Sequence, residues 1–271
     1  MPKAPSAPLP PPKMPPPAVS TRQSKTFTSS TGVIARGKRI GIYGSGGIGK
    51  TELANMLPSA KFIDTDEGTH HRDYIERVDG VETWQDILDA LRQDSLWDGV
   101  QSVVIDSATR AEILAVKHTL KTVKASGDKY PDNIEGYGDG KGYQHVFDTF
   151  LHLFAELDRH VAKGRNVCLV CHDCQDTVDN PTGDNWKRFE PRLQDPSSGK
   201  GSIRLMFREW CDYLFYLKYD VAADDGKVKG AGTRTIYGNE MPDFWAKSRP
   251  AIEPVPYTDG DDQLWKTIGI K

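Results

Sequence analysis

The feature that most constrains this chain is an eight-residue segment, residues 44–51, with the sequence Gly-Ser-Gly-Gly-Ile-Gly-Lys-Thr. It follows a short apolar segment, residues 38–43, that is typical of a buried strand. It precedes residues 52–57, which favour a helix that Pro58 stops. The sequence therefore predicts a strand, a glycine-rich turn and a helix in direct succession, the start of a β–α unit.

These eight residues match the phosphate-binding pattern G-x-x-x-x-G-K-[ST], the P-loop. Glycines allow backbone N–H groups to converge on phosphate oxygens, and the start of the helix adds a positive dipole end. We expect Lys50 to reach the β- and γ-phosphates and Thr51 to offer its hydroxyl to Mg²⁺. The segment thus predicts binding of ATP or GTP with Mg²⁺ by Gly44, Ser45, Gly46, Gly47, Ile48, Gly49, Lys50 and Thr51. The sequence has no Asn-Lys-x-Asp segment of the kind that reads guanine, which favours ATP.

Strand-like and helix-like segments alternate along the rest of the chain. Alternation of this kind predicts an α/β fold with a mostly parallel central sheet flanked by helices. The residues between the elements are expected to be loops, and two of these loops are long: 127–143 and 173–202. The expected strands are 61–64, 102–106, 166–171 and 212–218. Three further helices are expected: one that begins after Thr83, one whose apolar face contains Ile113, Val116, Leu120 and Val123, and one that covers residues 147–161.

Composition divides the chain unevenly. Nine of the eighteen prolines lie in the first 17 residues, and residues 1–51 contain eight Lys or Arg but no Asp or Glu. We therefore expect a basic, disordered tail over residues 1–35, a core over 36–250 and an acidic C-terminal tail over 251–271. The sequence contains neither an apolar run long enough to span a membrane nor a signal-like start, which favours the cytoplasm. The cysteines are then expected to be reduced thiols: Cys168, Cys171, Cys174 and Cys211.

Acidic residues follow two of the expected strands. Asp106 ends the strongly apolar strand 102–106 and is predicted to anchor Mg²⁺; capping of the next helix is the alternative. Asp66 and Glu67 follow the strand 61–64, where a group that activates or orients water is needed, and Asp64 is expected to support them. A solvated turn with no catalytic role is the alternative for that segment.

Taken together, these residues resemble the phage-encoded RecA-like ATPases, minimal RecA cores of which some act in single-strand annealing and phage recombination. The resemblance covers residues 37–250. It implies ATP hydrolysis, binding of single-stranded DNA, assembly into a ring or filament in the host cytoplasm, and contact with a single-strand-binding or replication protein. It is carried by residues 44–51, 62–68 and 103–107, by the strand that ends in His172, and by residues 246–249.

The resemblance also assigns roles to single residues. The glutamate that activates water in RecA corresponds to Asp66, which is one methylene shorter, so Glu67 is a second candidate. His172 would sense the γ-phosphate, and Lys247 and Arg249 would meet ATP bound to a neighbouring subunit. A strand-end histidine without function and two surface cations beside Pro250 are the alternatives.

In the same family the loops after the third and fourth strands line a DNA channel. Here both loops contain cations and aromatic residues, which can contact phosphates and stack on bases. Acidic residues interrupt the positive charge, so ordinary solvated loops are the alternative. The candidate DNA-binding residues are Lys129, Lys141, Lys187, Arg188, Arg192 and Lys200.

Other functions fit the sequence less well. The Asp64-Thr-Asp66 segment is similar to the substrate-binding Asp-x-Asp of shikimate-type kinases, but an arginine-rich lid is lacking. A helicase loader or other AAA-type remodelling ATPase would need a helical lid domain, for which residues 231–271 look too short. The pattern Cys168-x-x-Cys171-His172 matches a haem attachment motif, but it falls in an expected central strand whose alternation points the two cysteines to opposite faces.

Overall fold

The computed structural model describes residues 29, 31–32, 36–224 and 227–270. The chain divides into two units, Met1–Ile34 and Ala35–Lys271, and the second is described below. The basic tail expected over residues 1–35 lies almost wholly outside the described residues. Among the helices that the structure describes, none combines the length and apolar character needed to span a membrane.

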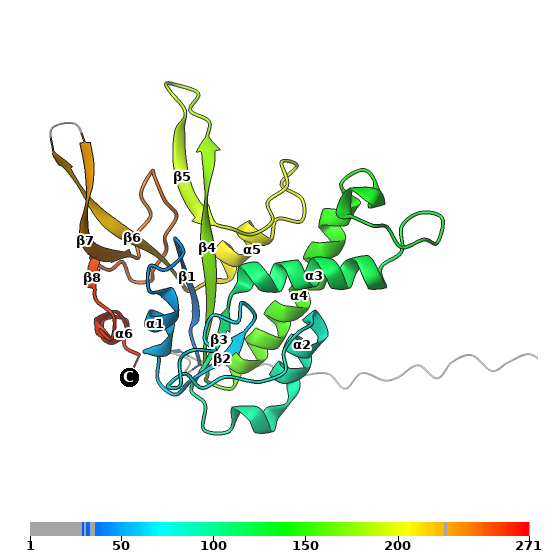
Figure 1. Ribbon diagram of the computed structural model, residues 1–271, viewed down its shortest axis with the longest axis horizontal. Coiled ribbons are helices and arrows are strands. Elements are labelled where there is room, and N and C mark those ends of the chain that lie inside the picture. Colours follow the sequence, from blue (N-terminus) through cyan, green and yellow to red (C-terminus); the bar gives the residue numbers. More distant parts are fainter. Residues whose placement is uncertain (1–28, 30, 33–35, 225–226, 271) are drawn as a thin grey trace, which may run out of the picture. The chain divides into compact units, whose positions relative to one another are not determined.

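A single mixed sheet forms the centre of the second unit, in the order β2-β3-β4-β1-β6-β7-β8, with β5 paired to β4 (Figure 1). The five strands from β2 to β6 in this order are parallel, and β5, β7 and β8 are antiparallel to their neighbours. The expected α/β class with a mostly parallel sheet is confirmed. The strands are β1 (Arg39–Gly44), β2 (Ala60–Asp64), β3 (Ser102–Asp106), β4 (Asn166–Val178), β5 (Trp186–Pro191), β6 (Tyr213–Asp224), β7 (Lys227–Tyr237) and β8 (Val255–Tyr257).

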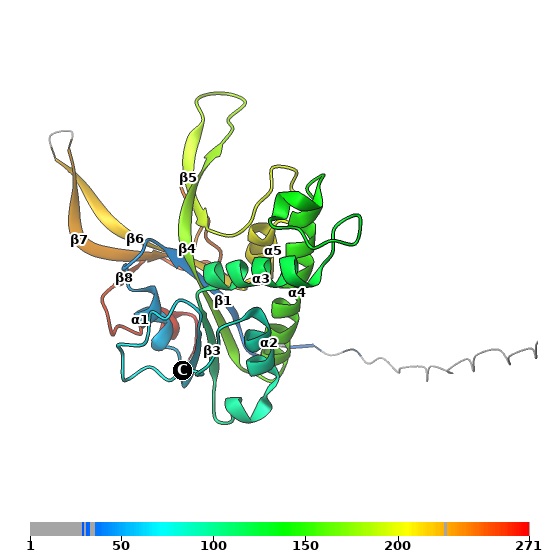
Figure 2. The ribbon, with the colours of Figure 1, turned by 45° about the vertical axis from the view of Figure 1, so that its right-hand side comes forward.

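Helices cover both faces of this sheet (Figure 2). Side chains of α2, α3, α4 and α5 form one apolar cluster with Tyr43, while those of α1 and α6 form a second with Ile42. Cys171 belongs to the first cluster and Cys168 to the second, so the two thiols face opposite sides of β4, as expected. The helices are α1 (Lys50–Asn55), α2 (Trp84–Arg92), α3 (Ala108–Thr122), α4 (Lys141–Ala162), α5 (Ile203–Trp210) and α6 (Gln263–Thr267), with short 3₁₀ turns η1 (Asp94–Trp97) and η2 (Ile134–Tyr137).

Helix α2 begins where the sequence predicts, and α3 is present as expected but buries a different face. The Thr83 hydroxyl accepts from the Asp86 N–H, and the Asp86 carboxylate accepts from the Thr83 N–H, which closes a capping box. In α3 the residues that face the core are mainly alanines and Leu114, whereas Ile113 is 41% exposed. The prediction chose the face with the larger apolar side chains. The structure buries the face with small residues, which allow α3 to pack closely against its neighbours.

The segment expected to be one long polar loop, residues 173–202, contains regular structure. Strand β4 continues through Val178 and pairs with β5 in an antiparallel hairpin, with Asp173 opposite Pro191 and Val178 opposite Trp186. The β4–β5 hairpin and the β6–β7 hairpin both project beyond the body of the sheet (Figure 1). Polar residues on both sides of an exposed hairpin lack the apolar alternation that would have predicted it.

Residues 251–270 also differ from the acidic tail expected there. Strand β8 pairs with β7, and α6 packs against α1 with Leu264 and Trp265 buried. The Trp265 indole N–H donates to the Leu53 carbonyl at 2.9 Å. The acids of residues 259–262 dominate the composition of this segment, but its apolar residues decide where it lies.

Candidate nucleotide-binding site

The predicted phosphate-binding residues lie at the carboxyl edge of the parallel strands. The register places Gly44 beside His172 and Asp64 beside Asp106, so β1, β2 and β3 end at this edge. Strand β4 lies between β1 and β3 and passes this edge at His172 on its way into the hairpin. A cavity of about 340 Å³ opens at this edge, lined by Gly46, Gly47, Gly49, Lys50, Thr51, Glu52, Asp66, Gly68, Arg72, Asp106, Ser107, His172 and Asp259.

Lys50 is held against the P-loop. Its ammonium donates to the carbonyls of Gly44 and Ser45 at 2.8 and 2.7 Å. Burial lowers the pKa of Lys50, although the nearby Asp106 and Asp173 carboxylates partly oppose the shift. Phosphate oxygens would be better partners than these neutral carbonyls, because they carry negative charge that attracts the ammonium.

Thr51 and Asp106 together offer the oxygen ligands that Mg²⁺ prefers. The Thr51 hydroxyl donates to Asp106 Oδ2 at 2.6 Å. Burial raises the pKa of Asp106 to about 6, with Asp64 and Asp66 adding to the rise and Thr51 and Lys50 opposing it. A buried carboxylate of this kind gains from a divalent cation, which would favour its ionised form. The two side chains therefore fit the predicted metal site.

Asp64 organises the turn that follows β2, as expected of a supporting residue. Its carboxylate accepts hydrogen bonds from the backbone N–H groups of Asp66, Gly68 and Thr69 and from the Thr69 hydroxyl. This turn places Asp66 in the lining of the cavity. Glu67 adopts a left-handed backbone (φ 58°), is exposed, and lies outside the lining that the described residues form.

Asp66 is held by two side chains that also face the cavity. The Ser107 hydroxyl donates to Asp66 Oδ2 at 2.6 Å, and His172 Nε2 lies 3.4 Å from the same oxygen. Burial tends to raise the pKa of Asp66, but hydrogen bonds from His172 and Ser107 outweigh it and hold the pKa below its usual value. Asp66 is therefore an ionised acceptor beside the candidate metal ligands Thr51 and Asp106, with His172 in contact with it.

Lys247 and Arg249 lie apart from this cavity in the described chain. The Lys247 ammonium donates to the carbonyls of Arg208, Glu209 and Cys211 at the end of α5, and burial lowers its pKa. Lys247 thus caps a helix of its own chain, a local role that its sequence position did not indicate. Arg249 is exposed.

The six candidate DNA-binding cations do not gather into one patch. Lys141 pairs with Asp139, and Arg188 pairs with Glu190 and stacks over Trp245. Among the described residues, the other four take part in no ion pair: Lys129, Lys187, Arg192 and Lys200. Arg192 lies nearest the nucleotide cavity, because its backbone N–H donates to the His172 carbonyl at 2.8 Å.

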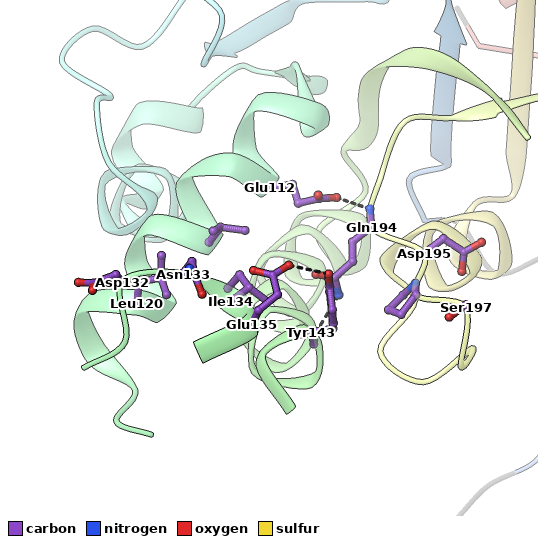
Figure 3. Close-up of a pocket in the computed structure, with 12 residues that line it drawn as sticks. Glu112, Leu120, Asp132, Asn133, Ile134, Glu135, Tyr143, Gln194, Asp195 and Ser197 are labelled. Carbon is purple, nitrogen blue, oxygen red and sulfur yellow. Dashed lines mark hydrogen bonds between the residues drawn. The ribbon is translucent and has the colours of Figure 1, made fainter. Parts of the chain in front are cut away.

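A groove of about 640 Å³ separates the two loops that carry these cations (Figure 3). Its walls contain Glu112, Asp132, Glu135 and Asp195, and its floor is apolar. Glu112 accepts from the Gln194 N–H at 2.6 Å, and Tyr143 donates to Glu135 at 3.1 Å. The groove is acidic, so the face between the loops is not where phosphates would bind.

Sequence reasoning missed several residues around the nucleotide cavity. Arg72, which pairs with Glu52 at 2.9 Å, and Asp259 both line it. Asp259 comes from the segment expected to be a tail, and it pairs with Arg234 of β7 at 2.9 Å. Neither Arg72 nor Arg234 stands in a recognisable motif, so only the tertiary structure reveals them.

Comparison with known proteins gives a matching family and solved structures of similar fold. The sequence model of a family described as AAA domain matches residues 36–250. A KaiC-like protein from the hyperthermophilic archaeon Pyrococcus horikoshii has a similar solved structure, with 12% sequence identity, a TM-score of 0.41, and coverage of 84% of this chain and 88% of that one. No curated protein matches the sequence.

Proposed function

We propose that this chain, which belongs to the AAA domain family of P-loop ATPases, hydrolyses ATP with Mg²⁺ and uses the reaction to act on single-stranded DNA in recombination or annealing. The P-loop cavity supports the ATPase part of this proposal. The strand that leads from that cavity into the β4–β5 hairpin supports the DNA part.

In the proposed reaction each polar side chain of the cavity has one task. Lys50 moves from the Gly44 and Ser45 carbonyls to the β- and γ-phosphates and neutralises their charge. Thr51 and Asp106 hold Mg²⁺, which supplies further charge neutralisation when bound. Asp66, ionised and fixed by Ser107, orients the attacking water. Glu67 is less suited because it lies outside the lining of the cavity.

The observation that carries the DNA part is the continuity of β4. His172 contacts Asp66 at the catalytic end, and the next residue, Asp173, already pairs with β5 in the hairpin. A change at the γ-phosphate that moves His172 would therefore shift the base of the hairpin. Arg192, bonded through its backbone to the His172 carbonyl, would move with it.

The proposed DNA path runs along the β4–β5 hairpin and not through the acidic groove. Lys187 is exposed on the hairpin, and Trp186 is 37% exposed beside it. Cations bind the backbone without regard to sequence, and an exposed indole can stack on an unpaired base. The carboxylates of the groove would repel the same backbone and so confine it to the hairpin side.

We also propose that the protein forms oligomers in which Arg249 of one subunit contacts ATP bound to the neighbouring subunit. Lys247 is engaged with three carbonyls at the end of α5, so it is the weaker candidate. An exposed guanidinium suits a role across an interface, because it binds phosphate through two N–H groups at once.

Two other functions are less well supported by particular residues. A kinase that used Asp64 and Asp66 for its substrate would need both carboxylates in the cavity, but Asp64 is bonded to its own turn. A remodelling ATPase with a helical lid would need a helical domain after the core. The described residues after β7 contain only the short helix α6 and strand β8.

The proposal is tested by ATP hydrolysis with and without single-stranded DNA, in wild type and in Lys50→Ala. We expect hydrolysis that DNA stimulates, and a fall of at least about 100-fold in Lys50→Ala at both conditions. Lys163→Ala, which removes an exposed lysine that pairs with Asp94 far along the chain from the P-loop, is the matched control. Hydrolysis indifferent to DNA would remove the DNA part and leave the ATPase part.

A further inference from the structure

We propose that three side chains behind the P-loop belong to the nucleotide site, because they hold its carbonyl groups. This inference rests on the proposed binding of ATP. Tyr219 of β6 lies with its hydroxyl 3.5 Å from the Gly47 carbonyl, Arg234 of β7 donates to the Ile48 carbonyl at 2.9 Å, and Tyr257 of β8 donates to the Gly49 carbonyl at 3.1 Å. Three consecutive carbonyls are thus met by side chains of three adjacent strands.

The geometry of the peptide bond gives these contacts their meaning. In a planar trans peptide the carbonyl of one residue and the N–H of the next point in opposite directions. When the carbonyls of Ile48 and Gly49 are held from behind, the N–H groups of Gly49 and Lys50 face the opposite side, where phosphate oxygens bind. The Arg234 hydrogen bond therefore fixes the direction of the Gly49 N–H. The Tyr257 hydroxyl fixes that of the Lys50 N–H together with the Leu53 N–H, which donates to the same Gly49 carbonyl at 2.9 Å.

Arg234 makes the strongest of these contacts. Its guanidinium also pairs with Asp259 at 2.9 Å and lies over the Tyr257 ring, 4.8 Å from the centroid. Only 16% of its side chain is exposed. A charged donor polarises the peptide group it binds, so Arg234 strengthens the Gly49 N–H as a donor to phosphate as well as aligning it.

The close fit behind the loop explains why residue 49 is a glycine. Gly49 has a left-handed φ of 104°, and a Cβ there would lie 2.7 Å from Arg234 Nη1 and 3.0 Å from Tyr257 Cε1. Any larger residue would push the two side chains off the loop. We therefore regard Arg234 and Tyr257 as positioning residues for phosphate binding, with Tyr219 as a weaker third.

The test measures binding of a fluorescent ATP analogue with Mg²⁺ to the full chain. Tyr257→Phe removes one hydroxyl and keeps the ring under Arg234. Arg234→Gln removes the charge, and Arg234→Lys restores it without the planar guanidinium. Tyr213→Phe is the matched control, because its hydroxyl also donates to a carbonyl, that of Arg249 at 3.0 Å, away from the P-loop.

We expect binding about fivefold weaker in Tyr257→Phe and about thirtyfold weaker in Arg234→Gln, partial recovery in Arg234→Lys, and wild-type affinity in Tyr213→Phe. The two Tyr→Phe variants should melt at similar temperatures, which separates positioning from general stability. Wild-type affinity in Tyr257→Phe would overturn the inference, even if Arg234→Gln failed to fold. Absence of binding in the wild type would instead overturn the proposed ATPase function itself.

Discussion

Two carboxylates near the same edge of the sheet, Asp66 and Glu112, have opposite pKa shifts. Burial acts on both in the same direction, but Asp66 accepts hydrogen bonds from Ser107 and His172, and its pKa falls below the usual range. Glu112, in the wall of the acidic groove, accepts from the Gln194 N–H, and its pKa rises to about 7. Glu112 is the more deeply buried of the two and accepts fewer hydrogen bonds, so burial prevails at Glu112 and hydrogen bonding prevails at Asp66.

The largest expected effect comes from removing the charge of Asp66 without changing the shape of its side chain. In Asp66→Asn the side chain keeps its volume but loses the charge that we propose orients water, and we expect ATP turnover to fall about 100- to 10,000-fold. Nucleotide affinity should change little, because Lys50 and the P-loop remain. Single-turnover hydrolysis together with equilibrium binding of the ATP analogue separates the two effects.

Glu67→Gln serves as the matched variant one residue away. Because Glu67 is exposed and lies outside the cavity, its turnover should stay near that of the wild type. A large loss in Glu67→Gln with normal rates in Asp66→Asn would exchange the roles of the two acids.

A second, smaller effect concerns the hairpin beside the groove. Lys187→Ala combined with Lys200→Ala removes one cation of the hairpin and one of the loop that follows β5. Neither forms an ion pair among the described residues, and we expect roughly tenfold weaker binding of single-stranded DNA. The slope of affinity against salt concentration should fall by about one for each lost phosphate contact. Fluorescence anisotropy of a labelled oligonucleotide over a salt series measures both.

Lys124→Ala is the control for this double variant, since Lys124 already pairs with Asp128 at 2.8 Å. If it weakens DNA binding as much as the double variant does, the hairpin holds no special path for DNA. An unchanged salt slope in the double variant would count against the path in the same way.

The smallest expected effect concerns Glu112 and the dependence of protein stability on pH. Glu112 keeps its proton in the folded protein up to about pH 7, whereas its usual pKa is 4.5. Folding therefore binds a proton between these values, and stability from this group is complete at low pH and declines as pH rises towards 7. Glu112→Gln should abolish that decline and be more stable at pH 8 by on the order of 1 kcal/mol, after allowance for its partial exposure.

Urea unfolding of wild type and Glu112→Gln at pH 4, 6 and 8 checks this prediction. The two curves should coincide at pH 4 and separate by pH 8. A separation of the same size at every pH would show that the change acts through packing and not through the proton.

Features that depend on short stretches of sequence could be predicted, and features that depend on packing between distant segments could not. The P-loop, Asp106 and the succession of strands along the chain depend on short local patterns, so the parallel sheet and the residues around Lys50 were predictable. The position of β2 was not: the sequence suggested a place beside β1, but β2 pairs with β3. The path of residues 251–270 and the contacts of Arg234 and Tyr257 depend on packing between segments about 200 residues apart, which no local pattern records. Lys247 shows the same limit, since its three carbonyl partners lie on a helix that the sequence did not suggest.

The fit of β8 and α6 against the P-loop also sets the order in which the protein can mature during synthesis. Every motif residue has left the ribosome once residue 250 has emerged, yet the Gly49 carbonyl still lacks the Tyr257 hydroxyl and Leu53 still lacks the Trp265 indole. The phosphate-binding loop is among the first parts of the core to be made and among the last to be completed. A nascent chain should thus acquire nucleotide affinity late, after the sheet and most of its helices have already formed.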